Sequence, residues 1–362
     1  MTLSVEQVSQ ALQSVVDPNT EKDLVSGKSA RNIRIEDGDV SVDVELGYPA
    51  RSQIDPIRKQ VIAAIKALAG VENVSANVYQ KIVAHTVQRG VKTMPNVKNI
   101  IAVASGKGGV GKSTTAANLA LALSAEGASV GVLDADIYGP SQPTMLGITG
   151  RPDSRDGKTL EPMEGHGIQA SSIGFMIDPD TPMVWRGPMV SGALQQLLRD
   201  TNWRDLDYLV IDMPPGTGDI HLTLSQKIPV TGSIIVTTPQ DIALLDARKG
   251  LKMFEKVGIP ILGIVENMAM HICSSCGHQE HIFGQGGGEK MAAEYDVEYL
   301  GGLPLDIRIR EQADSGKPTV VADPDGDIAA TYRQIARRIA VRIAQQSKDM
   351  SSKFPSIVVQ NT

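Results

Sequence analysis

The stretch Gly106-Lys107-Gly108-Gly109-Val110-Gly111-Lys112-Ser113-Thr114 decides the fold of this 362-residue chain. It has the phosphate-loop pattern G-x-x-x-x-G-K-S, with an apolar strand at residues 99–104 before it and a helical run rich in Ala and Leu at 116–125 after it. Glycines let backbone N–H groups turn inward around phosphates, and the helix adds the positive end of its dipole. Lys112 is therefore expected to reach the β and γ phosphates of a nucleotide, and the Ser113 hydroxyl to bind magnesium.

Two later strands deliver carboxylates that suit this chemistry. Residues 129–133 lead to Asp134-Ala135-Asp136, whose two carboxylates face the same way because they lie two residues apart on an extended chain. One of them can position magnesium or water while the other braces the loop. The strand at residues 208–211 leads to Asp212, a position that suits a carboxylate behind the magnesium ion.

The remaining elements continue the alternation of strands and helices. Strands at residues 233–237 and 261–265 flank a helix at 241–257, so the sequence predicts a doubly wound, mostly parallel α/β sheet. Ligands of such sheets bind at the carboxyl ends of the strands, which places Asn267 where it can meet an adenine edge. A last amphipathic helix, residues 332–343, is expected to pack on this domain rather than on a membrane.

The first ninety residues form a different unit. A helix capped by Ser4 precedes two strands joined at Asp37-Gly38, and a helix opened by Asp55-Pro56 precedes a strand at residues 74–78. This α-β-β-α-β order predicts a small α+β module with a structural or partner-binding role. The expected domains are the module at residues 1–90, a linker at 91–99, the nucleotide-binding domain at 100–346 and a disordered tail at 347–362.

Composition limits the classes of protein to which the chain can belong. It has 35 basic and 41 acidic side chains and a net charge of −6, which argues against dedicated nucleic-acid binding. No apolar stretch reaches the ~18 residues of a membrane span, and the first ten residues lack the order of a signal peptide. We therefore expect a cytoplasmic protein that binds no nucleic acid and has no stable membrane association.

Lys107 lies inside the phosphate loop, where the minimal pattern asks for no particular side chain. A lysine at the tip of a loop is poorly placed to reach the γ-phosphate of its own nucleotide, yet it can reach one bound by a facing subunit. A solvated lysine is the plainer interpretation. The run KGGVGKST resembles the deviant Walker A loop of dimeric ATPases, a class that includes septum-positioning and plasmid-partition proteins, the nitrogenase iron protein and iron-sulfur scaffold ATPases.

The two cysteines, Cys273 and Cys276, lie a few residues beyond Asn267 and so on the nucleotide face of the predicted sheet. Three interpretations are open: a redox pair, a zinc site completed by His271, His278 and His281, or half of a shared iron-sulfur cluster. A cluster usually takes four thiolates, and one chain offers two. A symmetric dimer that meets across its nucleotide faces would supply all four thiolates. The same dimer would let Lys107 reach the nucleotide of the facing subunit.

The order of these motifs resembles a known family. The deviant Walker loop, DADIYGPS, DMPPGTGD, VENM and the cysteine pair, preceded by the α+β module, are similar to the Mrp/ApbC-type iron-sulfur cluster carrier ATPases. The resemblance covers almost the whole chain. It implies a homodimer that binds ATP and Mg²⁺, holds a [4Fe-4S] cluster between Cys273 and Cys276 of both subunits, and passes it to apoproteins in contact with cluster assembly proteins.

The resemblance also implies individual roles within the site. Lys112 and Lys107 would bind the phosphates, Asp136 would orient the attacking water, and Asp212 would stand behind the magnesium ion. Asn267 and Pro304 would lie around the adenine, with Pro304 in the segment Gly302 to Asp306 that covers the base. Two alternatives to a cluster carrier stay open. One is a positioning or partition ATPase that acts on membrane or DNA, and the other is a zinc-stabilised nucleotide switch.

Overall fold

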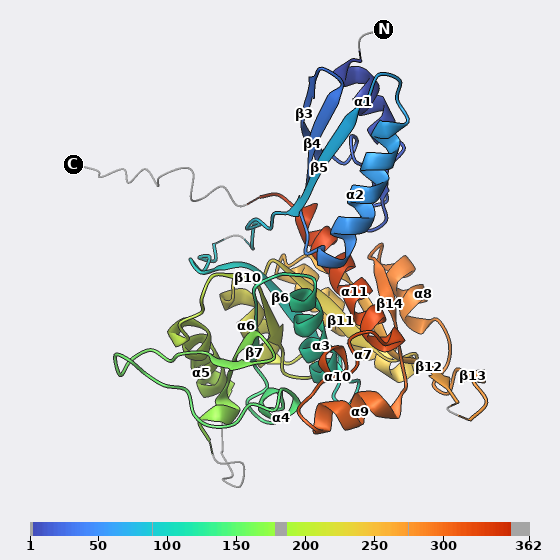
Figure 1. The fold of residues 1–362 in the computed structure, drawn as a ribbon. Helices are drawn as coiled ribbons and strands as arrows, with labels where there is room; N and C mark the ends of the chain where they lie inside the picture. The colour runs from blue at the N-terminus through green and yellow to red at the C-terminus, as the bar shows by residue number, and fades with distance from the viewer. Residues whose placement is uncertain (1–2, 89, 178–186, 274, 349–362) are drawn as a thin grey trace.

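The computed structural model describes residues 3–88, 90–177, 187–273 and 275–348, which form a small domain and a large one (Figure 1). The small domain contains α1 (Val5–Leu12), β1 (Val16–Asp17), β2 (Lys22–Asp23), β3 (Ala30–Glu36), β4 (Asp39–Leu46), α2 (Arg51–Lys66) and β5 (Asn73–Gln80). The large domain contains β6 (Val97–Ala104), α3 (Lys112–Ala125), β7 (Val130–Asp134), α4 (Gln142–Met145), β8 (Met163–Gly165), β9 (Ile168–Ser172), the 3-10 helix η1 (Ile173–Phe175), α5 (Gly187–Asp200), β10 (Leu206–Asp212), α6 (Asp219–Lys227), β11 (Gly232–Thr237), α7 (Asp241–Lys256), β12 (Ile261–Ile272), β13 (Gln279–Glu280), α8 (Gly287–Glu294), β14 (Tyr299–Pro304), α9 (Ile307–Asp314), α10 (Thr319–Ala322) and α11 (Asp327–Ala344).

The small domain is a three-stranded sheet covered by helices on one face. β3 and β4 pair antiparallel, β4 and β5 pair parallel, and α1 and α2 lie on the same side of the sheet (Figure 1). Every second residue of β4 from Val40 to Leu46 is buried, as the alternating sequence predicts. α1 begins after Ser4, whose hydroxyl accepts the Gln7 N–H at 3.4 Å while the Gln7 side chain accepts the Ser4 N–H at 3.0 Å.

The second helix begins earlier than the sequence pattern predicts. α2 starts at Arg51, and Pro56, which was expected to open the helix, lies inside it. The Arg51 N–H donates to the Glu126 carbonyl and the Ser52 N–H to the Glu126 carboxylate, both at 3.0 Å. A residue of the large domain thus caps the helix, and a local pattern cannot reveal a cap so distant in sequence.

The large domain confirms the doubly wound α/β fold, with helices on both faces of the sheet (Figure 1). Its strands lie in the order β8-β9-β7-β10-β6-β11-β12-β14; all are parallel except β8, and β13 pairs antiparallel with the end of β12. β6 begins at Val97, two residues before the predicted start at Asn99, and its residues 100–104 are buried. Consecutive buried apolar residues suit a central strand covered on both faces.

β12 is longer than predicted and contains a bulge. The backbone at Met268 has φ +57°, and pairing with β14 resumes at Met270, so β12 continues to Ile272. Asn267 therefore lies within the strand rather than beyond its end. The segment Gly302 to Asp306 was expected to follow a strand. In the structure β14 continues to Pro304, so the first three residues of that segment belong to the strand.

The last helix packs on the large domain, as the sequence predicts. One face of α11 is buried along its length, against α3 and β14. None of the described helices is long and apolar enough to cross a membrane. The Ser347 carbonyl accepts the Thr86 N–H at 3.0 Å, and Lys348 forms an isolated β-bridge with His85. The first two residues of the predicted tail therefore lie against residues 85–86. Its residues 349–362 lie outside the described part of the chain.

Candidate nucleotide and thiol site

The loop between β6 and α3 has the backbone that a phosphate loop requires. Gly109 and Gly111 have φ of +81° and +82°, a left-handed conformation that other residues rarely adopt. A Cβ at Gly111 would collide with the side chain of Asn267, and a Cβ at Gly106 would collide with the backbone at Asp246 in α7. The glycines therefore let the loop fit closely between β12 and α7.

Asn267 holds this loop in place. Its Nδ2 donates to the Val110 carbonyl at 2.9 Å, across 157 residues of sequence. This gives Asn267 a supporting role that the sequence did not predict, and its contact with adenine stays a prediction. Gly108 is exposed at the tip of the loop, and Thr114 lies in the first turn of α3.

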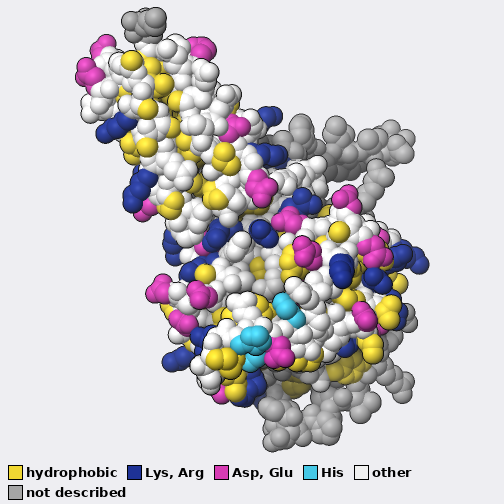
Figure 2. Space-filling view, turned by 90° about the vertical axis from the view of Figure 1, so that its right-hand side faces the viewer, with side chains coloured by type: hydrophobic (Ala, Val, Ile, Leu, Met, Phe, Trp, Pro, Cys, Tyr) yellow, Lys and Arg dark blue, Asp and Glu magenta, His cyan; other side chains and the backbone are white. Residues whose placement is uncertain are grey.

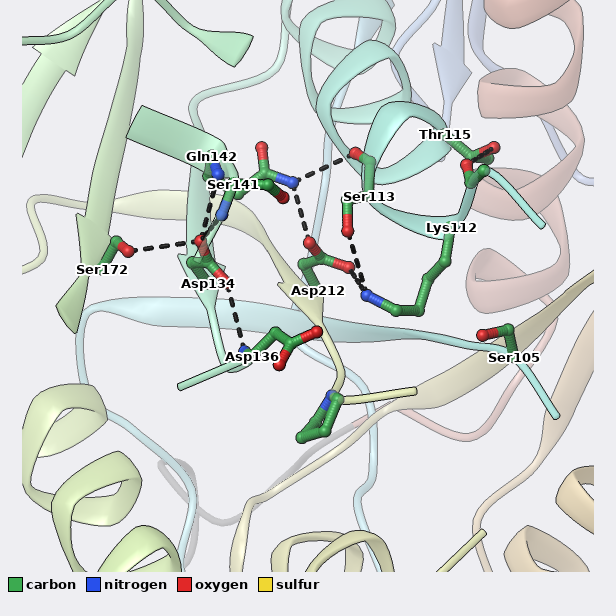
Figure 3. A network of polar contacts seen from close by, with 12 residues as sticks. Ser105, Lys112, Ser113, Thr115, Asp134, Asp136, Ser141, Gln142, Ser172 and Asp212 are labelled. Atoms are coloured by element: carbon green, nitrogen blue, oxygen red, sulfur yellow. Dashed lines mark hydrogen bonds and ion pairs between the residues drawn. The ribbon is translucent and has the colours of Figure 1, made fainter. Parts of the chain in front are cut away.

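Lys112, Ser113 and Asp212 meet at one point (Figure 3). Lys112, at the start of α3, forms an ion pair with Asp212 at the end of β10, and its Nζ lies 3.1 Å from the Ser113 hydroxyl. Gln142 joins them, because its Nε2 donates to the second Asp212 oxygen at 2.9 Å and to the Ser113 carbonyl at 3.0 Å. The structure thus brings together the side chains that the sequence predicts for phosphate and magnesium binding.

Asp134 braces the loop that carries Asp136. Its fully buried carboxylate accepts the N–H groups of Asp136 at 3.1 Å and of Gln142 at 3.0 Å (Figure 3). Burial, with Asp212 nearby, raises the pKa of Asp134 to about 7. Asp136 is half-buried and extends toward Lys112 and Asp212 (Figure 3); burial raises its pKa and Lys112 opposes that rise. One carboxylate therefore braces the backbone while the other faces the phosphate site.

The loop after β10 is tied to the phosphate loop and to α6. The Gly216 N–H donates to the Ser105 carbonyl at 3.1 Å. His221 Nε2 lies 2.7 Å from the Pro214 carbonyl, to which it donates, and the ring meets Phe254 edge-on with 6.0 Å between centroids. His221 is 2% exposed, and burial lowers its pKa to about 4, so the imidazole is neutral at pH 7.

Lys107 and Pro304 lie apart from this network. Lys107 is half-buried and forms no ion pair with any carboxylate in the described part of the chain. Pro304 lines a cavity of ≈ 390 Å³ beside β12 and β14, together with Met270 and Arg308. Asn267 does not line that cavity, so the structure does not place the two residues predicted around adenine in one cavity.

The cysteines lie at the tip of the hairpin formed by β12 and β13. The Cys273 N–H donates to the His278 carbonyl and the Gly277 N–H to the Cys273 carbonyl, both at 2.9 Å. Both thiols are free, and Cys276 is exposed. Backbone N–H groups point at the Cys273 sulfur and lower the pKa of its thiol. The Cys276 N–H has the largest effect on this pKa, followed by the Ser275 N–H. The hairpin thus presents two sulfurs, one of them in an environment that favours the thiolate.

The histidines near the thiols do not complete a metal site within one chain. The Nδ1 atoms of His271 and His281 lie 3.0 Å and 2.7 Å from the backbone carbonyls of Leu305 and Ala269, and donate to them. Among the described residues of a single chain, no three His, Cys, Asp or Glu side chains lie together as metal ligands would. The described residues of one chain therefore do not bring Cys273, Cys276 and these histidines together as a zinc site.

Fold and phosphate loop together define a P-loop nucleoside triphosphatase with a deviant Walker A loop. Residues 96–340 match the model of the NUBPL iron-transfer P-loop NTPases, and residues 5–78 match that of an iron-sulfur cluster assembly protein. The chain belongs to the NUBPL iron-transfer P-loop NTPase family, and its resemblance to iron-sulfur cluster carrier ATPases is confirmed.

Relatives of the chain carry names consistent with this family. The chain is 51% identical over 345 residues to an iron-sulfur cluster carrier protein of Escherichia coli strain K12, covering 94% of this chain and 93% of that protein. It is 50% identical over 254 residues to the mouse iron-sulfur cluster transfer protein NUBPL, covering 70% and 80%. Among solved structures, a nucleotide-binding protein of Archaeoglobus fulgidus in complex with ADP is 37% identical, with a TM-score of 0.56 over 64% of this chain and 90% of that one.

Proposed function

We propose that the chain is an ATP-hydrolysing carrier that holds a [4Fe-4S] cluster between Cys273 and Cys276 of two identical subunits and transfers it to apoproteins. The observation that carries this proposal is the free pair of thiols at the same edge of the sheet as the phosphate loop. One chain supplies two thiolates, so a site with four requires a second copy. The names of the relatives support the same function.

Exposed apolar side chains on this face support a homodimer. Ile272 and Ile282, 44% and 50% exposed, flank the thiol hairpin. Ile242 and Leu245 of α7, 70% and 54% exposed, lie beside the phosphate loop, since Gly106 abuts that helix. Figure 2 shows hydrophobic and histidine side chains together on this part of the large domain. A second copy meeting this face would cover the apolar surface and bring four thiols together.

The residues at the phosphate loop fit ATP and Mg²⁺. The Ser113 hydroxyl is an oxygen ligand of the kind that magnesium prefers, and the Asp212 carboxylate would stand behind the ion. Bound magnesium would neutralise charge that develops on the phosphates. In this proposal Lys112 leaves Asp212 to bind the β and γ phosphates, and Asp136 orients the attacking water. Lys107, which has no carboxylate partner in the described chain, binds the nucleotide of the facing subunit.

Anaerobic reconstitution with iron and sulfide tests the proposal. The wild-type protein should become a brown dimer with about four iron atoms per dimer. Cys276→Ala should bind no cluster yet keep ATP hydrolysis, because the thiols are separate from the phosphate site. Lys112→Ala should lower the hydrolysis rate by about two orders of magnitude or more while keeping the cluster. A monomeric protein that takes up no iron would contradict the proposal.

The same experiment distinguishes a cluster carrier from the two alternatives. A nucleotide switch held by zinc would give a colourless protein whose metal analysis shows zinc. A positioning or partition ATPase would hydrolyse ATP with both cysteines replaced and show no iron-dependent function. We further propose that the carrier works in the cytoplasm, where exposed thiols such as Cys276 stay reduced.

A further inference from the structure

A second cavity lies where the small domain meets the large one. It measures ≈ 400 Å³ and is lined by residues of the small domain and by the C-terminal end of α11. The phosphate loop lies at the N-terminal end of α3. The small domain contacts the opposite end of this helix, through its C-cap residue Glu126. No residue of the phosphate loop or of the described thiol hairpin lines this cavity. The cavity is therefore separate from the proposed nucleotide and cluster sites.

The lining of this cavity is basic, although the whole chain has a net charge of −6. The charged side chains that line it are Lys22, Lys28, Arg31, Lys81 and Lys348 against Asp17 and Glu45, an excess of three positive charges. Glu45 pairs with Arg31 at 3.2 Å and with Lys81 at 3.6 Å. The other three cations, all lysines, have no carboxylate partner within the described chain.

Two buried acceptors in the same lining lack a hydrogen-bond donor. Asp17 is 1% exposed; its Oδ1 accepts the Tyr48 hydroxyl at 2.7 Å, and its Oδ2 has no partner among the described residues. His85 is 2% exposed, and its Nε2 likewise has none. An unsatisfied buried acceptor is costly, so such an atom points to a ligand or an ordered water that donates to it.

The tautomer of His85 follows from its neighbour. Asn99 Nδ2 donates to the carbonyls of Val83 at 3.0 Å and Asp207 at 3.2 Å, so the atom that faces the imidazole is the Asn99 carbonyl oxygen. His85 Nδ1 lies 3.0 Å from that oxygen and donates to it. Burial lowers the pKa of His85, which keeps the ring neutral and leaves a lone pair on Nε2.

We propose that this junction cavity binds a small hydroxylated polycarboxylate. Carboxylates would pair with Lys22, Lys28 and Lys348, and a hydroxyl would donate to Asp17 Oδ2 or His85 Nε2. An ammonium could also donate, but the excess of positive charge disfavours a cationic donor. The cavity volume is within the range of small-molecule sites. Because the ligand would contact the small domain and α11 together, its binding would stabilise the association of the two domains.

Isothermal titration of the full-length protein with two matched probes tests this proposal. Citrate carries three carboxylates and a hydroxyl, and tricarballylate carries the same carboxylates without the hydroxyl. Titrations run at equal ionic strength and without magnesium should show one citrate per chain. Tricarballylate should bind at least about tenfold more weakly, because the buried acceptor is then left without its donor. Equal affinities, or no citrate binding at millimolar concentration, would overturn the proposal.

Charge-reversal variants locate the site. Lys22→Glu with Lys28→Glu should weaken citrate binding by at least about tenfold. The matched control, Lys59→Glu with Lys66→Glu, changes the net charge equally on the exposed surface of α2, outside the cavity, and should shift the affinity by less than about twofold. Lys112→Ala should also leave the affinity unchanged. Loss of citrate binding in Lys112→Ala would place the anion at the phosphate loop and refute the junction site.

Discussion

His221 is a buried neutral imidazole that holds the loop after β10, and its burial has a consequence for stability. The unfolded chain has an imidazole of ordinary pKa, 6.5, while the folded value is about 4. On acidification the unfolded state therefore binds a proton first, and stability falls as the pH drops from about 6.5 to about 4. Between about pH 7.5 and about pH 5 this one group should remove roughly 2 kcal/mol of unfolding free energy.

The variant His221→Gln isolates this effect. Glutamine keeps a donor for the Pro214 carbonyl and does not titrate, so urea unfolding at the two pH values should show a loss smaller than that of the wild type by roughly 2 kcal/mol. His278→Gln, an exposed site on the thiol hairpin, is the matched control and should keep the wild-type pH dependence. Identical pH dependence in wild type and His221→Gln would show that His221 does not titrate in this way.

At the residue scale the sequence was most informative where one motif determines the chemistry. The loop from Gly106 to Thr114 could be predicted because few chains place a Gly-Lys-Ser after a strand for any other purpose. Gln142 and His221 were missed, although Gln142 directly follows DADIYGPS and His221 closely follows DMPPGTGD. An amide or an imidazole has many uses in a protein, and only the tertiary contacts with Asp212 and Pro214 reveal these two.

At the scale of elements, α3 connects the phosphate loop to the small domain. Glu126, at its C-terminal cap, is 1% exposed and accepts Arg337 of α11 at 2.6 Å and the Ser52 hydroxyl at 2.8 Å. Glu126→Gln keeps the shape but removes the charge, so Arg337 loses its carboxylate partner and keeps only its hydrogen bonds to Asn19 and Ser52. We expect a loss of roughly 2 to 3 kcal/mol in urea unfolding.

The control for this prediction is another Glu on a helix of the same domain. Glu255→Gln, exposed near the end of α7, should change the unfolding free energy by less than about 0.5 kcal/mol. If Glu126→Gln were as mild as Glu255→Gln, the ion pair would contribute little, and the contact between the start of α2 and the end of α3 would depend on the backbone hydrogen bond from Arg51 to Glu126 instead.

The element boundaries show why part of the fold could not be predicted. The order of strands and helices in the large domain follows from hydrophobic alternation, which is local. The start of α2 depends on Glu126, 74 residues after Ser52, and the extension of β12 depends on pairing with β13 and β14 after the bulge at Met268. Such ends are decided by distant partners, so sequence periodicity locates an element more reliably than its limits.

At the scale of the whole molecule, the proposed dimer depends on the apolar surface of α7. Leu245 is 54% exposed and lies beside the phosphate loop, where a polar side chain would be more stable in a permanent monomer. Leu245→Arg should therefore leave folding unchanged within about 0.5 kcal/mol, yet bring two like charges together at the interface of a symmetric dimer.

Sedimentation velocity of the anaerobically reconstituted protein measures this effect. The wild type should sediment as a dimer with bound iron, and Leu245→Arg should sediment mainly as a monomer with much less iron, because two thiolates alone cannot complete a four-thiolate site. Val16→Arg provides the matched control, since Val16 is 48% exposed on the small domain and should not affect the dimer. A Leu245→Arg protein that is dimeric and fully loaded would place the interface away from α7, and the four thiols would then have to meet through the hairpins alone.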